Sequence, residues 1–118
     1  MNKDWVQTTK DLSFALKDLR GGAPAVMQGF SAIAQAALKT NALDTKTKEL
    51  IALAIGVATR CDGCIAFHAE AAVKQGASRE EVLETMGMAI YMGAGPSVMY
   101  AAQALEAFDQ FQDLKNSA

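Results

Sequence analysis

The sequence predicts an all-α fold, and three observations support that fold class. Apolar residues recur at helical spacing, and no stretch shows the strict alternation of a half-buried strand. Hydrophobic residues make up 51% of the 118, and only two prolines are present to interrupt helices. Glycine-containing or polar segments separate the apolar stretches. A chain of this length forms one domain, so we expect residues 1–118 to be a single compact unit of about six helices.

Three helices are expected in the first half of the chain. The first covers residues 4–19 and ends at a Gly-Gly pair. The second covers residues 24–39; its first residue is a proline, which suits the first turn of a helix, and many of the others are alanine. Asp44 or Thr45 caps a third helix that extends over residues 45–60.

Three more helices are expected in the second half. The fourth begins inside a Cys-x-x-Cys segment and ends at Gly76, a residue that suits a helix C-terminus. A capping-box pattern at Ser78 opens the fifth, over residues 79–92. The Gly-Ala-Gly-Pro segment 93–96 separates it from the sixth, over residues 97–114.

Both cysteines and the only histidine lie within eight consecutive positions, as Cys61, Cys64 and His68. Cysteines three apart can bring their sulfurs together on one helical turn, and unpaired N–H groups at a helix start lower the pKa of a thiol. Asp62 opposes that effect electrostatically, although it could also cap the helix. His68 lies one turn beyond Cys64 on the same face, where an imidazole can accept the thiol proton or stabilise the thiolate.

Other interpretations of these three residues differ in strength. A c-type haem site needs a histidine directly after the second cysteine, and Ile65 is there instead. Zinc would have three ligands here with a carboxylate or water as the fourth, but the chain has no second Cys or His pair for a structural site. Inert buried residues remain a further alternative. Dithiol redox chemistry explains the pattern best.

Helix arithmetic adds Glu49 to this group. In a straight helix Glu49 lies about 18 Å along the axis from Cys61, so it cannot reach the cysteines directly. If the third and fourth helices form an antiparallel hairpin, His68 returns about 10 Å along the same path, within reach of Glu49. The expected order is thiol, imidazole, carboxylate. The alternative is that Glu49 is only a first-turn acid favoured by the helix dipole.

The Cys-x-x-Cys-x-x-x-His motif at Cys61, with Glu49 twelve residues earlier, resembles the alkylhydroperoxidase (AhpD-like) branch of the carboxymuconolactone decarboxylase family. Segments 43–50, 76–81 and 93–96 also resemble that family, and the likeness covers about residues 23–110. It implies an AhpD-like helical domain with the Cys-x-x-Cys at the start of the fourth helix. A thioredoxin is disfavoured, because its motif follows a strand.

The resemblance also implies roles for the site residues. Cys64 would attack the peroxide, Cys61 would resolve the product, and His68 and Glu49 would form a proton relay. The redox-active Cys61–Cys64 pair would need no further cofactor and no metal. Some peroxidase members carry a histidine between the cysteines, where this chain has Gly63. Decarboxylase members generally lack the cysteine pair.

Composition limits the partners and the compartment. The net charge is −2, with 11 basic and 13 acidic residues interspersed, so we expect neither nucleic acid nor a membrane as a partner. The N-terminal residues lack a signal-peptide core and no apolar run could span a bilayer, so a cytoplasmic protein is expected. In that compartment a Cys-x-x-Cys pair is usually redox-active or metal-bound.

The sequence therefore predicts a thiol-dependent oxidoreductase of the alkylhydroperoxide reductase type. Its substrate would be a small organic hydroperoxide or disulfide, and its reductant an external dithiol or redox protein. The resemblance implies a homo-oligomer, a trimer or a hexamer. Two alternatives remain: a decarboxylase-like lyase that uses the same pocket, and a non-catalytic redox-sensing module.

Overall fold

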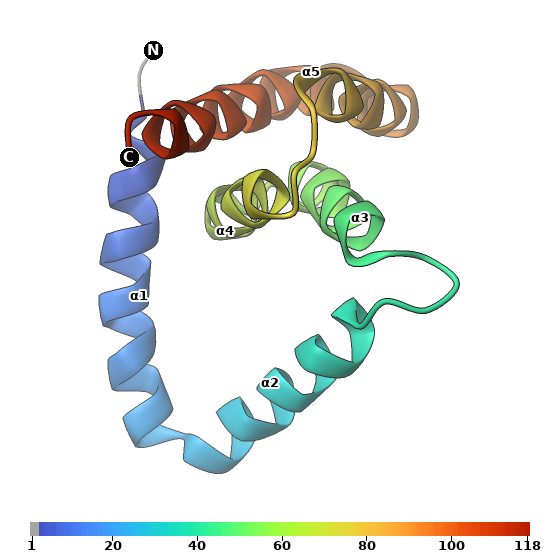
Figure 1. Cartoon of the computed structure of the whole chain (residues 1–118). Coiled ribbons are helices and arrows are strands. Elements are labelled where there is room, and N and C mark those ends of the chain that lie inside the picture. The colour runs from blue at the N-terminus through green and yellow to red at the C-terminus, as the bar shows by residue number, and fades with distance from the viewer. Residues whose placement is uncertain (1–2) are drawn as a thin grey trace.

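The computed structural model describes residues 3–118 and is all-helical over that range, as expected. Figure 1 shows the five helices in chain order. Their bounds are α1 (Trp5–Gly22), α2 (Pro24–Leu38), α3 (Thr45–Ala58), α4 (Asp62–Lys74) and α5 (Arg79–Asn116). The Cys-x-x-Cys segment does stand at the start of the fourth helix.

The helix count of about six is corrected to five, because α5 includes both of the last two expected helices. The expected break is present as a sharp reversal at Ala94, whose φ of 56° and ψ of −144° are not helical. Thirty residues of straight helix would separate Arg79 from Asp109 by about 45 Å, yet their side chains form an ion pair at 3.0 Å. The two halves of α5 therefore run antiparallel.

The residues around Ala94 explain why the reversal is so tight. A side chain at Gly93 would overlap the side chain of Ser97, so only glycine allows the two turns to approach. Pro96 has no N–H to donate and so suits the first turn of the second half. Within Arg79–Asn116, Ala94 is the one residue with non-helical φ and ψ, so the two halves follow each other without a longer loop.

The helix starts follow the capping patterns of the sequence. Asp44 accepts a hydrogen bond from the Thr47 N–H. Ser78 and Glu81 cap α5 reciprocally. The Ser78 N–H, and then the Lys46 ammonium 2.9 Å away, lower the pKa of Glu81 below its ordinary 4.5. Because Lys46 is in α3, this cap also ties the start of α3 to the start of α5.

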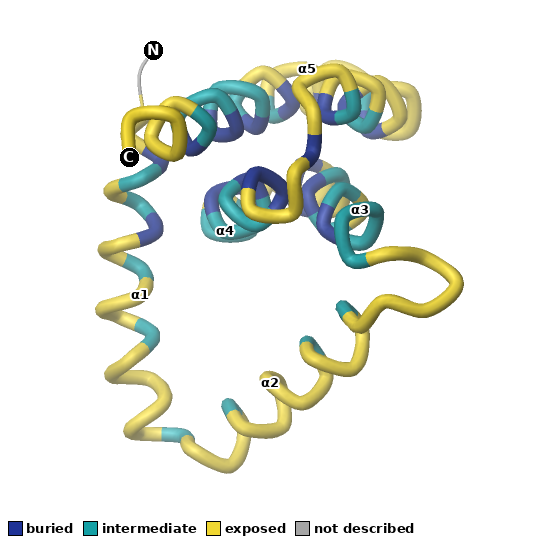
Figure 2. The backbone as a smooth tube through the Cα atoms, viewed as in Figure 1, coloured by how far each residue is buried: buried dark blue, intermediate teal, exposed yellow. Residues whose placement is uncertain are grey.

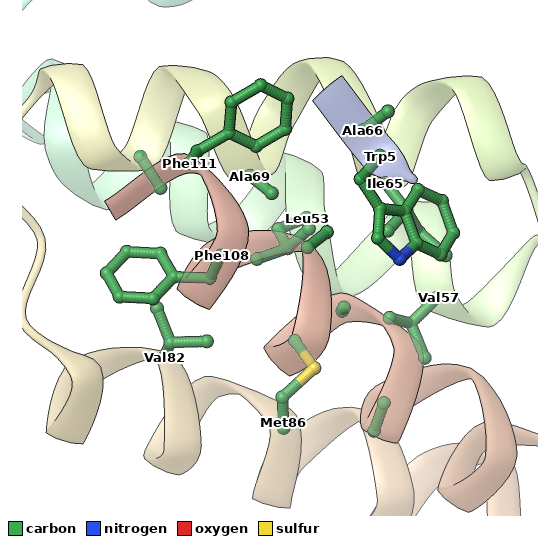
Figure 3. Close-up of a cluster of buried hydrophobic side chains, with 14 of the residues drawn as sticks. Trp5, Leu53, Val57, Ile65, Ala66, Ala69, Val82, Met86, Phe108 and Phe111 are labelled. Atoms are coloured by element: carbon green, nitrogen blue, oxygen red, sulfur yellow. The ribbon is translucent and has the colours of Figure 1, made fainter. Parts of the chain in front are cut away.

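The core lies between the α3–α4 hairpin and α5, with one side chain supplied by α1 (Figure 3). Its largest fully buried side chains are Trp5, Phe108, Leu53, Ile65, Val57 and Val82. Small residues of α4 and α5 are buried among them, which lets the helices pack closely. The core thereby fixes α3 against α4 and sets the geometry of the hairpin that carries the cysteines.

The far part of α1 and all of α2 form an arm that extends from this body (Figure 1). Figure 2 shows that the arm is exposed almost throughout, and α2 has no buried residue. The exposed apolar side chains of α2 are Val26, Phe30 and Ile33, each more than 60% accessible. Over residues 3–118, no helix is long and apolar enough to cross a membrane.

Candidate functional site

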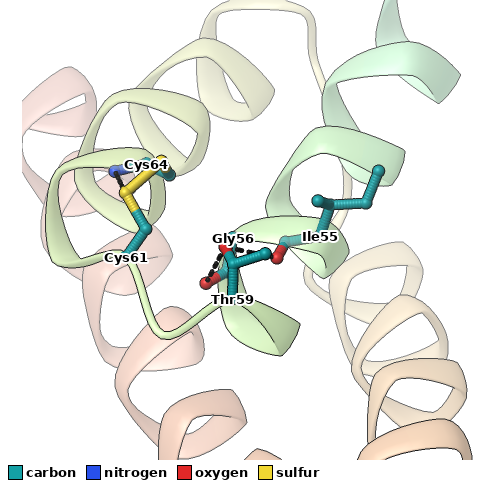
Figure 4. The surroundings of a disulfide bond; sticks show 5 residues. All are labelled: Ile55, Gly56, Thr59, Cys61 and Cys64. Carbon is teal, nitrogen blue, oxygen red and sulfur yellow. Dashed lines mark hydrogen bonds between the residues drawn. A yellow bond between two sulfur atoms is a disulfide. The ribbon is translucent and has the colours of Figure 1, made fainter.

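The two cysteines stand at the turn between α3 and α4 (Figure 4). After α3, Arg60 adopts a left-handed conformation with φ of 56°, which reverses the chain. The Cys61 N–H then donates to the Gly56 carbonyl oxygen at 3.0 Å. Cys61 is the N-cap of α4, and its Sγ accepts a hydrogen bond from the Cys64 N–H at 3.1 Å.

Cys61 and Cys64 form a disulfide, with their Cα atoms 5.2 Å apart. The prediction that their sulfurs meet on one turn is therefore confirmed. Both residues are half-buried. The N-cap contact belongs to Cys61, so the start of α4 favours a negative charge on that sulfur once the disulfide is reduced.

Glu49 and His68 meet across the α3–α4 hairpin, as the helix arithmetic predicted. The Nδ1–H of His68 donates to Oε1 of Glu49 across 2.6 Å. Glu49 is 5% exposed and lies beyond the first turn of α3, so it is more than an acid placed to suit the helix dipole. The carboxylate thereby fixes the tautomer of the ring and leaves Nε2 to act on other groups.

In this disulfide form, the expected contact between His68 and a cysteine sulfur is not made. Within residues 3–118, no hydrogen bond is recorded between His68 and either cysteine sulfur. The His68 side chain is 33% exposed, so part of the ring reaches solvent. The structure therefore brings Glu49 to His68 and Cys61 to Cys64, and it places the two pairs on the same hairpin.

Two glycines position the cysteines, and the sequence reasoning missed the first of them. A Cβ atom on Gly56 of α3 would lie 3.1 Å from the Cβ atom of Cys64, so glycine there allows α4 to approach. Its signal was a glycine inside an otherwise apolar helical stretch. A Cβ atom on Gly63 would lie 2.9 Å from Cδ1 of Leu12 in α1. The position between the two cysteines is thus covered by α1.

An apolar groove of about 660 Å³ lies on the other face of α3, against the first half of α5. It reaches Arg60, the residue before Cys61, and Ser97 at the α5 reversal. Its main apolar side chains are Leu50, Ile51, Ile55, Met88 and Met92. In the described part of the chain, no cluster of three His, Cys, Asp or Glu residues is placed to hold a metal ion.

Comparison with known proteins agrees with this architecture. Residues 24–107 match the carboxymuconolactone decarboxylase family. An uncharacterised protein from Haemophilus influenzae is 44% identical over 108 residues, which are 92% of this chain and 96% of that protein. An uncharacterised protein from Cupriavidus necator is 42% identical over 86 residues, which are 73% of this chain and 76% of that protein.

Solved structures lead to the same family. A carboxymuconolactone decarboxylase family protein from Legionella pneumophila, crystallised in the apo form, is 57% identical with a TM-score of 0.90, covering 92% of this chain and 96% of that one. A Thermotoga maritima protein is 25% identical with a TM-score of 0.82, covering 99% and 100%. The helical fold, the cysteine pair at the start of α4 and these likenesses agree: the chain belongs to the carboxymuconolactone decarboxylase family.

Proposed function

We propose that this protein is a cytoplasmic thiol oxidoreductase that reduces small organic hydroperoxides through a Cys61–Cys64 dithiol–disulfide cycle. The observation that carries the proposal is one hairpin that holds both a Cys-x-x-Cys disulfide and a buried Glu49–His68 hydrogen bond. A purely structural disulfide needs no adjacent imidazole oriented by a carboxylate. A reducing compartment would keep the pair in its dithiol form between turnovers.

The cycle begins when the Cys64 thiolate attacks the terminal oxygen of the hydroperoxide. An S–O bond forms, the O–O bond breaks, and the leaving alkoxide takes a proton to become an alcohol. The Cys61 thiolate then attacks the sulfenic sulfur, so that the disulfide forms and hydroxide leaves as water. An external dithiol supplies two electrons, restores both thiols and becomes a disulfide itself.

The contacts of the two sulfurs support this division of labour. Cys61 accepts the backbone N–H at the start of α4, which suits a resolving thiolate and a good leaving group during reduction. Cys64 lies one turn before His68 on the same helix, so in the reduced form the imidazole can take the thiol proton. Glu49 would stabilise the imidazolium that results. The cycle needs no other cofactor.

The comparisons with known proteins support a redox role in general, without indicating a substrate. A second crystal structure of the Thermotoga maritima protein, 28% identical with a TM-score of 0.73, covers 80% of this chain and 97% of that one, and a possible role in the antioxidative response is assigned to that protein. The apolar groove beside Arg60 is compatible with an organic substrate. The substrate in this proposal is a hydroperoxide or a disulfide, with no nucleic acid and no membrane involved.

We also propose that the protein works as a homo-oligomer, a trimer or a hexamer. The support is the exposed α1–α2 arm, in which α2 has no buried residue and keeps Val26, Phe30 and Ile33 exposed. The accessible surface of 7270 Å² exceeds the value of about 6,200 Å² for a compact monomer of this mass. A second copy is the simplest cover for such an arm.

Cysteine substitutions test the catalytic proposal. We expect Cys64→Ser to abolish consumption of cumene hydroperoxide with dithiothreitol as reductant. Cys61→Ser should retain one stoichiometric oxidation, which a sulfenic-acid-trapping dione would label at Cys64. Unchanged turnover in Cys64→Ser would overturn the proposal. Activity on any substrate that survives full alkylation of both thiols would favour the lyase alternative, and a redox-dependent change in assembly without turnover would favour the sensing module.

A further inference from the structure

Lys3 contacts the segment between the two cysteines although it lies 59 residues away in the chain. Its Nζ is 2.8 Å from Oδ2 of Asp62, the first residue of α4. Asp62 follows Cys61 directly and precedes Cys64 by two positions. A lysine from the N-terminal segment thus places a positive charge against Asp62, the residue whose carboxylate the sequence analysis found to oppose a thiolate.

The backbone around Lys3 is anchored, so this contact is more than a mobile surface pair. Gln110 of α5 holds it at two points: Nε2 donates to the Lys3 carbonyl oxygen at 2.7 Å, and Oε1 accepts the Trp5 N–H at 2.7 Å. Trp5 is fully buried, and its indole N–H donates to Glu106 at 2.9 Å. The ammonium also lies 5.1 Å from the Trp5 ring centroid, within cation–π range.

An unpaired Asp62 carboxylate would disfavour the thiolate form of the adjacent cysteines, because like charges repel. A thiolate is what stabilises the reduced state of a reactive dithiol. We infer that Lys3, anchored by Gln110 and Trp5, is a positioning residue that neutralises Asp62 and so keeps the Cys61–Cys64 disulfide readily reducible. The biological importance of this inference rests on the proposed function. The inference itself concerns the redox equilibrium of the Cys61–Cys64 pair, which can be measured without a substrate.

Lys3 is not the only charged residue around the cysteines, so its effect on the disulfide must be separated from the effects of other charges. Arg60 and Asp62 flank Cys61 in the sequence, His68 of α4 is bonded to Glu49 of α3, and Glu106 of α5 is bonded to Trp5. The Lys3 side chain is 43% exposed and that of Asp62 48%, so the pair is open to screening by salt.

The effect of Lys3 on reduction of the disulfide should be modest, because an exposed ion pair contributes little free energy. We expect Lys3→Met to lower the equilibrium constant for reduction of the disulfide by glutathione about threefold, which for a two-electron couple is about 14 mV. The reduced protein should also react about threefold more slowly with iodoacetamide at pH 7, since the reagent is uncharged and reports the thiolate. Asp62→Asn should move both quantities in the opposite direction.

The experiment compares matched variants in glutathione redox buffers at low salt and at 1 M salt. Lys17→Met removes the same charge from an exposed site further along α1, and Lys3→Arg should restore the wild-type equilibrium. We expect the Lys3→Met shift to vanish in 1 M salt and to shrink by more than half in a D62N background. If Lys3 had a purely structural role, the Lys3→Met shift would persist in 1 M salt and in the D62N background.

Three outcomes would overturn the inference: a Lys3→Met shift no larger than that of Lys17→Met, a shift that persists in 1 M salt, or one of full size in the D62N background. No peroxide enters the measurement. Failure of the wild-type protein to reduce hydroperoxides would therefore count against the proposed function and leave this result intact. Conversely, a peroxidase without the Lys3 effect would count against this inference alone.

Discussion

At the scale of single residues, the proposed chemistry of the dithiol depends on how His68 is held. Its Nδ1–H is committed to Glu49 at 2.6 Å, and Glu49 is almost fully buried. A buried carboxylate that orients an imidazole favours the charged ring that forms when a thiol proton is taken. The pair therefore acts as a unit, and its two members can be separated by substitution.

We expect His68→Gln to lower hydroperoxide turnover about 10²-fold, the lower end of the range for a general base. It should also move the pH midpoint of thiol alkylation upward, because no imidazole remains to take the proton. Glu49→Gln keeps a hydrogen-bonding partner for the ring but loses the charge, so an intermediate loss is expected. Glu70→Gln, which removes a half-buried carboxylate of α4 that pairs with Lys74 instead of His68, is the matched control. An alkylation profile unchanged in His68→Gln would remove His68 from the relay.

The contacts of the site differ in how far the sequence could predict them. Glu49 and His68 are 19 residues apart on two adjacent helices, so the rise per residue and one assumed hairpin were enough to pair them. Lys3 and Asp62 are 59 residues apart, and their contact depends on how Gln110 of α5 binds the N-terminal segment. No local pattern contains that information, because three elements must first be packed together.

At the scale of elements, α5 contains a strained backbone position at Ala94. Ala94 has a positive φ with a ψ of −144°, a region that side-chain-bearing residues seldom occupy. The Gly-Ala-Gly-Pro segment was enough to predict a break here. It could not predict that the two halves would pack antiparallel without a loop, since that depends on Gly93 fitting against Ser97 and on the Arg79–Asp109 ion pair.

We therefore expect Ala94→Gly to stabilise the protein by about 1 kcal/mol, because glycine adopts this conformation without the steric cost of a Cβ atom. Ala102→Gly, at an exposed helical position of the second half of α5, should instead cost about 1 kcal/mol. Urea unfolding followed by circular dichroism measures both. Equal destabilisation by the two substitutions would mean that Ala94 is not strained.

At the scale of the whole molecule, the chain divides into a packed body and an exposed arm. The body contains the core and the dithiol, whereas α2 leaves every one of its residues at least partly exposed. The surface exceeds that of a compact monomer by about 1,100 Å². This excess is comparable with the roughly 800 Å² that each partner buries in a standard interface. The alanine-rich sequence of residues 24–39 predicted a helix there, but it could not predict that this helix would lie away from the core of the same chain.

The last prediction concerns this arm. Val26, Phe30 and Ile33 recur at helical spacing on one face of α2, so they form a single apolar stripe. We expect light scattering at micromolar concentration to give three or six times the monomer mass of 12.5 kDa. A double substitution, Phe30→Glu with Ile33→Glu, should release monomers, because it buries charge in the proposed contact.

Gln35→Glu adds a single negative charge on the opposite face of the same helix and should leave the assembly unchanged. Circular dichroism would confirm that the released chain keeps its helices, since the core lies outside α2. A wild-type mass of 12.5 kDa would contradict the proposal directly. So would an oligomer that tolerates both glutamates, because the arm would then be exposed for a reason other than contact with a second copy.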